Sequence, residues 1–239
     1  MAAAERVNRR SAAMFVFHED VHYTERRPDG TFRRNTRASY EVSILEGEPY
    51  HRRTSLDGQP LSAVDAALED KRFREVEKFR RETPLEERRK RYFAAEENRF
   101  KIDSAIVVQY HEAKLVREEA FQGRACWVVE TAPRAGSPKP KRRSQWSLSQ
   151  RLQYWIDKET QFPIRVMATQ LFDFDTSRKG TLTEIISFQE EGTWLLKKIV
   201  SEGTRKMEGQ PIAYRTTQDY SDYQHFTTSS SVSFEPDLD

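Results

Sequence analysis

One stretch decides the fold of this chain: residues 151–168, which read RLQYWIDKETQFPIRVMA. Apolar residues occupy every second position on both sides of a short polar turn. They are Leu152, Tyr154 and Ile156 before the turn, and Ile164, Val166 and Ala168 after it. A period of two is typical of a β-sheet with one apolar and one polar face. The stretch therefore predicts an antiparallel hairpin.

Similar alternating segments lie on both sides of this hairpin. They are separated by turn signals such as Pro28-Asp-Gly30, in which proline fixes φ and glycine accepts positive φ. Further strands are expected at residues 14–26, 32–45, 50–55, 113–121, 125–131, 181–189, 194–203 and 212–226. We expect roughly ten strands in one antiparallel sheet, because chain neighbours usually pair.

The segment 62–101 has a different composition, with twelve basic and ten acidic residues. Ser62 with Asp65 predicts a helix N-cap, and Thr83-Pro84 predicts the start of a second helix. Apolar residues follow at roughly helical spacing. The segment is thus expected to form a charged helical insert that covers or flanks the sheet, and residues 3–13 could form another short helix.

Length and composition limit the classes of protein that fit. A chain of 239 residues suits one α+β domain over 1–239, with a polar C-terminal tail at 227–239. A formal net charge of +2 gives no overall field for nucleic acid, so none is expected as a partner. No apolar run is long enough to span a bilayer. The single cysteine, Cys126, excludes an internal disulfide and is expected to be buried and inert.

One motif suggests metal chemistry. His18-Glu19-x-x-His22 matches the zinc-protease pattern, which needs a helix to place both imidazoles on one metal ion. The flanking residues favour a strand, where the two histidines would lie about 13 Å apart. No nucleophile or phosphate-binding motif accompanies it. We expect no catalytic residue, metal or cofactor, and a zinc-dependent hydrolase remains the least favoured of three alternatives.

Three short motifs resemble a known family. They are Gly123-Arg-Ala-Cys-Trp-Val-Val-Glu130, Leu152-Gln-Tyr-Trp-Ile-Asp157 and Phe162-Pro-Ile-Arg-Val166. In this order they are similar to the bacterial outer-membrane lipoprotein-sorting proteins of the LolA-like and LppX-like superfamily. The resemblance implies a curved, incomplete antiparallel β-barrel whose open side is covered by helices. It also implies a non-enzymatic carrier of acyl chains in the periplasm or cell envelope. The start of the chain lacks the apolar core of a secretory signal, so an export signal is presumed to have been removed.

The expected ligand site is the apolar face of the curved sheet. A sheet that curls without closing leaves a concave face for side chains, a lid or a ligand to fill. The candidate lining residues are Trp127, Val129, Leu152, Tyr154, Ile156, Ile164 and Val166. The same residues could instead pack a closed core. If they line a cavity, Tyr154→Asp should abolish lipid retention with the fold intact.

The sequence therefore predicts a protein that binds or transports a lipid or a lipidated protein in the bacterial envelope. One alternative is an envelope scaffold or sensor that binds protein partners with its cavity filled by side chains. The basic runs Arg88-Arg-Lys-Arg91 and Lys139-Pro-Lys-Arg-Arg143 suggest peripheral contact with an anionic membrane surface, although such runs more often only face solvent.

Overall fold

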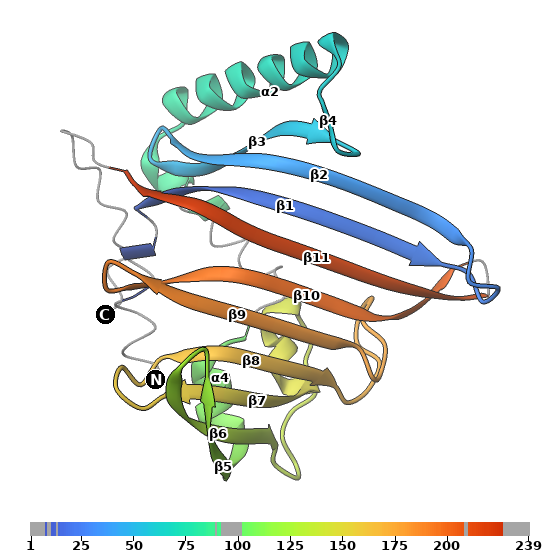
Figure 1. The fold of residues 1–239 in the computed structure, drawn as a ribbon, viewed down its shortest axis with the longest axis vertical. Helices are drawn as coiled ribbons and strands as arrows, with labels where there is room; N and C mark the ends of the chain where they lie inside the picture. The colour runs from blue at the N-terminus through green and yellow to red at the C-terminus, as the bar shows by residue number, and fades with distance from the viewer. Residues whose placement is uncertain are drawn as a thin grey trace.

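A computed structural model describes residues 8, 11–12, 14–88, 90–91, 102–207 and 210–226. One antiparallel sheet of eleven strands dominates the fold, in the order β4-β3-β2-β1-β11-β10-β9-β8-β7-β6-β5 (Figure 1). Every pair except β1·β11 joins strands that are neighbours in the sequence. The sheet remains open, because its edge strands β4 and β5 each pair on one side only.

The strands are long and mostly joined by tight turns. Their bounds are β1 Phe15–Arg26, β2 Phe32–Leu45, β3 Glu48–Leu56, β4 Gln59–Pro60, β5 His111–Phe121, β6 Arg124–Pro133, β7 Gln150–Asp157, β8 Pro163–Gln170, β9 Leu182–Glu190, β10 Thr193–Met207 and β11 Gln210–His225. The turn after β1 places Gly30 at φ 84°, a conformation that glycine adopts without a steric penalty.

Residues 85–88 and 90–91 are helical, and three further helical elements of the described chain accompany the sheet. They are α2 Ala63–Glu82, α4 Ser104–Tyr110 and the 3-10 helix η1 Arg143–Ser149. Ser62 caps α2 by accepting a hydrogen bond from the Asp65 amide, as the sequence predicts. Asp103 caps α4 through the amides of Ala105 and Ile106. No helix of the described residues is both long and apolar enough to cross a bilayer.

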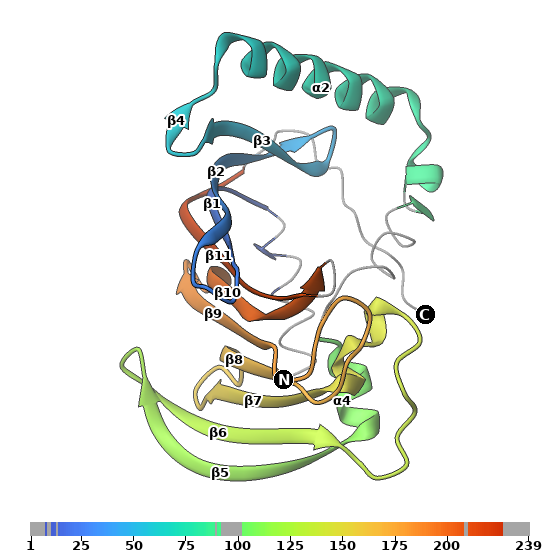
Figure 2. The same ribbon diagram turned by 90° about the vertical axis from the view of Figure 1, so that its right-hand side faces the viewer.

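The sheet is strongly curved, and the two sides differ (Figure 2). We call the concave side, where α4 and η1 pack, the inner face, and the other side the outer face. α2 runs along β3 at the far end of the curve, where Tyr50 contacts Phe73 and donates a hydrogen bond to Glu69 at 2.8 Å. The charged helix therefore flanks the sheet and leaves the middle of the inner face uncovered by α2.

Hydrophobic clusters lie on both faces of the β6–β8 region. The inner cluster contains Val107 of α4 and Trp146 of η1 against Leu152, Tyr154, Val166 and Ala168. The outer cluster contains Cys126, Val128, Trp155, Ile164 and Trp194. Both faces of this part of the sheet are therefore covered by buried apolar side chains.

The fold predicted from sequence is confirmed in class and topology. The hairpin at 151–168 forms β7 and β8, and the incomplete, curved antiparallel sheet with helices is an α+β arrangement. Three elements were missed, namely the short strand β4, helix α4 and the 3-10 helix η1. The expectations for 92–101, 227–239 and most of 3–13 lie outside the described residues.

Candidate functional site

A single row of side chains crosses the inner face from one side of the sheet to the other. Directly opposed residues of antiparallel strands point to the same face, so the strand registers define the row. It runs through Leu115, Val129, Tyr154, Val166, Ile185, Ile199, Gln218, Val21, Ala38 and Leu56. Gln218 is the one member without a largely apolar side chain. The inner face thus carries an almost unbroken apolar row across ten strands.

The two halves of this row are covered to different extents. Beneath α4 and η1, Tyr154 and Val166 are 1% and 7% exposed and belong to the inner cluster. Further along, the row is only half-buried at Ile185, which still packs against the inner cluster, and at Ile199, Gln218, Val21 and Ala38. We call these regions the covered half and the open half. In the open half these side chains therefore keep part of their surface exposed.

The seven residues proposed from sequence lie in the covered half or next to it. Leu152, Tyr154 and Val166 are buried in the inner cluster, and Ile156 packs against it while half-buried. Trp127 pairs directly with Ile156, and Val129 with Tyr154, and both are half-buried. Six of the seven are thus brought together on one face, and whether they contact a ligand remains a prediction.

Ile164 departs from this arrangement. It is 1% exposed and packs with Trp155 and Trp194 in the outer cluster. The pairing of β7 with β8 passes from Trp155↔Arg165 directly to Ile156↔Pro163, which leaves Ile164 as the additional residue of a β-bulge. A bulge interrupts the alternation of side chains. A strict period of two therefore predicts Ile164 on the inner face, whereas in the structure it lies on the outer face.

His111 fastens η1 to the sheet. Its Nε2 lies 3.1 Å from the carbonyl oxygen of Ser147, and its Nδ1 lies 3.1 Å from Oγ1 of Thr131. A carbonyl oxygen only accepts, so Nε2 carries the proton and Nδ1 of the neutral ring accepts from the Thr131 hydroxyl. Burial lowers the pKa of His111 below its ordinary value of 6.5, which favours this neutral form.

A buried carboxylate lies beside the open half. Glu19 is 6% exposed and accepts hydrogen bonds from His51 Nδ1 and Gln218 Nε2, each at 2.9 Å. Burial raises the pKa of Glu19, but the hydrogen bonds from His51, Gln218 and Tyr220 outweigh it, so the pKa is lowered from 4.5. Burial, reinforced by the charge of Glu19, raises the pKa of Tyr220. Glu19 is thus a fixed negative charge at the border of the apolar row.

The zinc-protease motif adopts the strand geometry expected from its flanks. His18 and His22 both belong to β1, and His22 Nε2 lies 2.8 Å from Oδ1 of Asn35. Glu19 points to the other face, toward His51. Within the described part of the chain, no group of three or more metal-ligating side chains is present. The motif therefore lacks the geometry that a helical zinc site requires.

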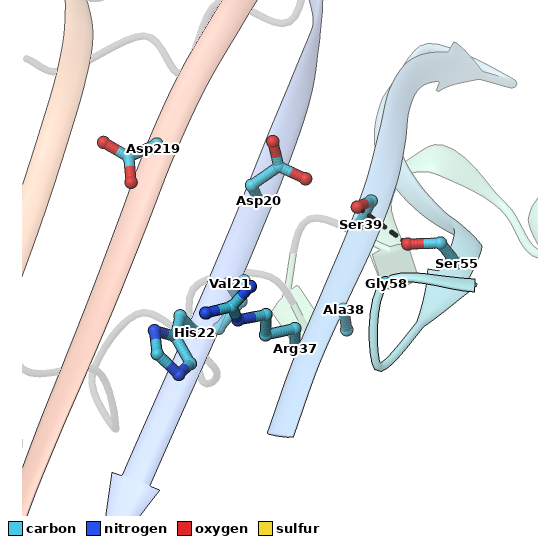
Figure 3. Close-up of a pocket in the computed structure, with 9 residues that line it drawn as sticks. All are labelled: Asp20, Val21, His22, Arg37, Ala38, Ser39, Ser55, Gly58 and Asp219. Atoms are coloured by element: carbon cyan, nitrogen blue, oxygen red, sulfur yellow. Dashed lines mark hydrogen bonds between the residues drawn. The ribbon is translucent and has the colours of Figure 1, made fainter. Parts of the chain in front are cut away.

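A shallow pocket of about 230 Å³ lies between β1, β2, β3 and β11, and its lining includes Val21 and Ala38 of the open half (Figure 3). Its polar lining includes Asp20 and Asp219, which are directly opposed in the β1·β11 register. Lys198 Nζ lies 2.9 Å from the Asp219 carboxylate, and Ser55 donates to Ser39 at 2.8 Å. A second pocket of about 330 Å³ is lined by the β5–β6 and β7–β8 turns. None of the seven residues proposed from sequence lines either pocket.

The two basic runs have different surroundings. In the first, Arg88 donates to the carbonyl of Glu46 and to the Glu48 carboxylate at 3.0 Å, and Arg91 donates to Glu87 at 2.7 Å. In the second, Lys139 and Lys141 are exposed and Arg143 pairs with Asp175. The described arginines of the first run therefore bind groups of the protein itself, namely the β2–β3 turn and a neighbouring helical residue.

Comparison with known proteins gives matches among solved structures only. A DUF1329 family protein from Desulfovibrio piger is 16% identical with a TM-score of 0.35, over 98% of this chain and 95% of that one. A LolA superfamily protein from Nitrosomonas europaea is 11% identical with a TM-score of 0.35, over 95% and 96%. An outer membrane lipoprotein-sorting protein domain from Vibrio parahaemolyticus is 13% identical with a TM-score of 0.37, over 96% and 92%. No family model and no curated protein matches the chain.

These structures include the superfamily that the sequence motifs resemble. At 11–16% identity these similarities concern the fold and not a ligand.

The open half contains the residues that sequence reasoning missed. Val21, Ala38 and Ile199 each lie in an alternating segment, but alternation alone does not say which segments are neighbours in space. The β1·β11 pairing joins strands from opposite ends of the chain, and only that register aligns Val21 with Ile199 through Gln218. The missing signal was the register of this pair.

Proposed function

We propose that this protein binds the acyl chains of a lipid or a lipidated protein on its inner face, without catalysis. The observation that carries the proposal is the apolar row that continues from the covered half into the half-buried open half. The chain would lie against Ile185, Ile199 and Val21. The half-buried members of the sequence-derived set, Trp127, Val129 and Ile156, extend the same surface at its other end.

The energetics suit such a ligand. Each methylene removed from water contributes about 0.8 kcal/mol, so ten methylenes contribute roughly 8 kcal/mol before the costs of association. In the five-strand segment from β9 to β2, the two outer strands are separated by four inter-strand spacings, or about 19 Å across the sheet. Apolar surface and length are sufficient for affinity, and a carrier needs no reactive side chain.

The ligand class and the motif resemblance together support a cellular compartment for the protein. We propose the periplasm or cell envelope, where lipoproteins and their carriers meet, with an envelope protein as donor or acceptor. This placement requires an export signal on the gene product, so sequencing the 5′ end of the gene tests it directly.

Two adjacent isoleucines of β9 provide a matched test. Ile185 belongs to the inner row, while Ile186 is directly opposed to Lys198 and Arg165 on the outer face, and both are half-buried. Ile185→Asn and Ile186→Asn therefore make the same chemical change on opposite faces. The purified chain is titrated with a fluorescent fatty acid, and the proposal predicts at least tenfold weaker binding for Ile185→Asn only, since a polar amide replaces apolar contact area.

Mass spectrometry of lipid extracted from the native protein complements this titration. Fatty acid or phospholipid recovered from the wild type and reduced in Ile185→Asn supports a carrier. No lipid in the extract, together with equal fatty-acid binding by the two variants, would refute it.

A second candidate is a protein-binding module with a self-filled cavity, as the sequence also allows. The complete burial of Leu152 and Tyr154 by the protein's own α4 and η1 favours it. In that case the protein retains no lipid, and an envelope protein is captured equally well by wild type and Ile185→Asn.

A further inference from the structure

The two ends of the sheet differ in charge. In this antiparallel topology the β1–β2, β3–β4, β6–β7, β8–β9 and β10–β11 connections lie at one end, which we call the tip end, and the β2–β3, β5–β6, β7–β8 and β9–β10 turns lie at the other. The described tip-end connections carry seven basic residues against four acidic ones; the basic ones are Arg27, Arg134, Lys139, Lys141, Arg142, Arg178 and Lys179, and the acidic ones are Asp29, Asp57, Asp173 and Asp175. Turns at the opposite end carry three acidic residues, Glu46, Glu159 and Glu191, and one basic residue, Lys158. A near-neutral chain thus has a locally basic end.

The β1–β2 hairpin lies at the tip end, beside the end of β10 and β11 (Figure 1). The nine residues 26–34, which include the turn, contain four arginines, and all four are exposed: Arg26, Arg27, Arg33 and Arg34. The nearby acid Asp29 accepts from the amide and hydroxyl of Thr31, at 2.9 and 2.7 Å, so it is used to close the turn. The hairpin tip therefore presents an excess of positive charge.

Three of these arginines contact groups without charge. Arg26 donates to the Gly30 carbonyl and lies 3.9 Å over the Phe32 ring, and Arg27 donates to the Phe32 carbonyl. Arg34 lies over the Tyr23 ring at 5.1 Å. Within the described residues, none of the three forms a salt bridge. Arg33 differs, because it is bound to the buried Glu25 at 2.6 Å.

An apolar ring completes the surface. Phe32 is 45% exposed at the turn, although burial of a phenylalanine side chain normally favours folding. An exposed aromatic ring surrounded by arginines matches the headgroup region of an anionic bilayer, where phosphates meet the guanidinium groups and the ring enters the acyl boundary. Nucleic acid fits less well, because the tip is a narrow turn with one ring and offers no groove or extended stacking surface.

We propose that the tip of the β1–β2 hairpin, formed by Arg26, Arg27, Phe32 and Arg34, docks on an anionic phospholipid bilayer. The docking site is separate from the inner face and holds whether or not the open half takes an acyl chain. It differs from the basic runs at 88–91 and 139–143 that the sequence alone suggested.

The test is co-sedimentation of the full chain with phosphatidylcholine vesicles and with vesicles of phosphatidylcholine and phosphatidylglycerol in equal parts. We expect binding only to the anionic vesicles, weakened by added salt because ions screen exposed charges. The triple variant Arg26→Gln, Arg27→Gln, Arg34→Gln should bind about 100-fold more weakly, because each arginine near an anionic surface contributes about 1 kcal/mol to the binding free energy. Phe32→Ser should bind about tenfold more weakly.

The matched control removes equal charge elsewhere. Lys71→Gln, Arg74→Gln, Lys78→Gln changes three exposed residues of α2, away from the hairpin, and should bind anionic vesicles like the wild type. Equal binding to neutral and anionic vesicles, no binding to either, or equal losses in the two triple variants would overturn the proposal. So would binding of an RNA or an acidic peptide with no binding of vesicles. Ile185→Asn should sediment like the wild type, which separates this proposal from that of the acyl site.

Discussion

The covered and open halves of the inner face have the same kind of row but different surroundings. In the covered half, side chains from α4 and η1 fill the concave surface, and Leu152 and Tyr154 are 0% and 1% exposed. In the open half, Ile199, Val21 and Ala38 are half-buried. The same alternating pattern therefore serves stability on one side of the sheet and leaves apolar surface available on the other. Sequence alternation identifies the face, while packing decides its use.

The largest expected difference between the halves comes from Tyr154→Asp. The sequence suggested this change as a test of lipid binding with the fold intact. Because Tyr154 is almost fully buried in the inner cluster, an aspartate there is expected to destabilise the protein by about 4 kcal/mol or more. Ile199→Asp, in the open half, should cost less than half as much, since its carboxylate can reach water. Urea unfolding followed by circular dichroism measures both, and similar losses would contradict the division into halves.

The next largest effect is expected at His111, which connects η1 to the sheet in the covered half. His111→Phe removes the hydrogen bonds to Ser147 and Thr131 and should cost about 1–3 kcal/mol at neutral pH. Since burial lowers the pKa of His111 in the folded state, its contribution to stability is present above the ordinary value of 6.5 and is lost as pH falls through the folded pKa. Wild type should thus lose stability as pH drops below 6.5, with faster hydrogen exchange in α4 and η1.

The variant His111→Phe should lack this particular loss, while His18→Phe, an exposed histidine of β1, should retain it. An unchanged pH profile in His111→Phe would show that other groups govern the covered half.

The covered half could be predicted from the sequence in large part, whereas the open half could not. The hairpin at β7–β8 was recoverable because both of its strands have clear alternation and a short turn lies between them. Ile164 was assigned to the wrong face because a β-bulge leaves no mark in the residue pattern. The helix α4 was missed because it has only seven residues and gains its stability from contact between Val107 and the sheet.

The open half was not predictable for a different reason. Its row depends on β1 pairing with β11, a contact between opposite ends of the chain that no local pattern encodes. Glu19 was noticed only as part of a metal motif. Its role as a buried hydrogen-bond acceptor depends on His51 and Gln218, which come from strands distant in sequence.

A smaller effect is expected at Glu19, on the border of the open half. Hydrogen bonds lower its folded pKa below 4.5 despite burial, so its contribution is present above that value and is lost as pH falls through the folded pKa. Glu19→Gln should lower stability at pH 7 by about 1 kcal/mol, because a charged acceptor is replaced by a neutral one. It should also flatten the pH dependence of the melting temperature below pH 4.5. A profile as steep as that of the wild type would contradict this assignment.

An effect similar in size to that at Glu19 is expected for Cys126→Ala, and the thiol of Cys126 is itself a probe of the covered half. Cys126 is 0% exposed in the outer cluster, directly behind the inner one, and burial raises the pKa of its thiol. Both factors suppress the reactive thiolate, so iodoacetamide should label the native protein far more slowly than the unfolded chain. Replacement by alanine removes one sulfur and should cost only about 1 kcal/mol. Labelling should accelerate in Tyr154→Asp but not in Ile199→Asp, because only the first change loosens the packing around β6–β8. Equal labelling rates in the two variants would mean that the halves open together.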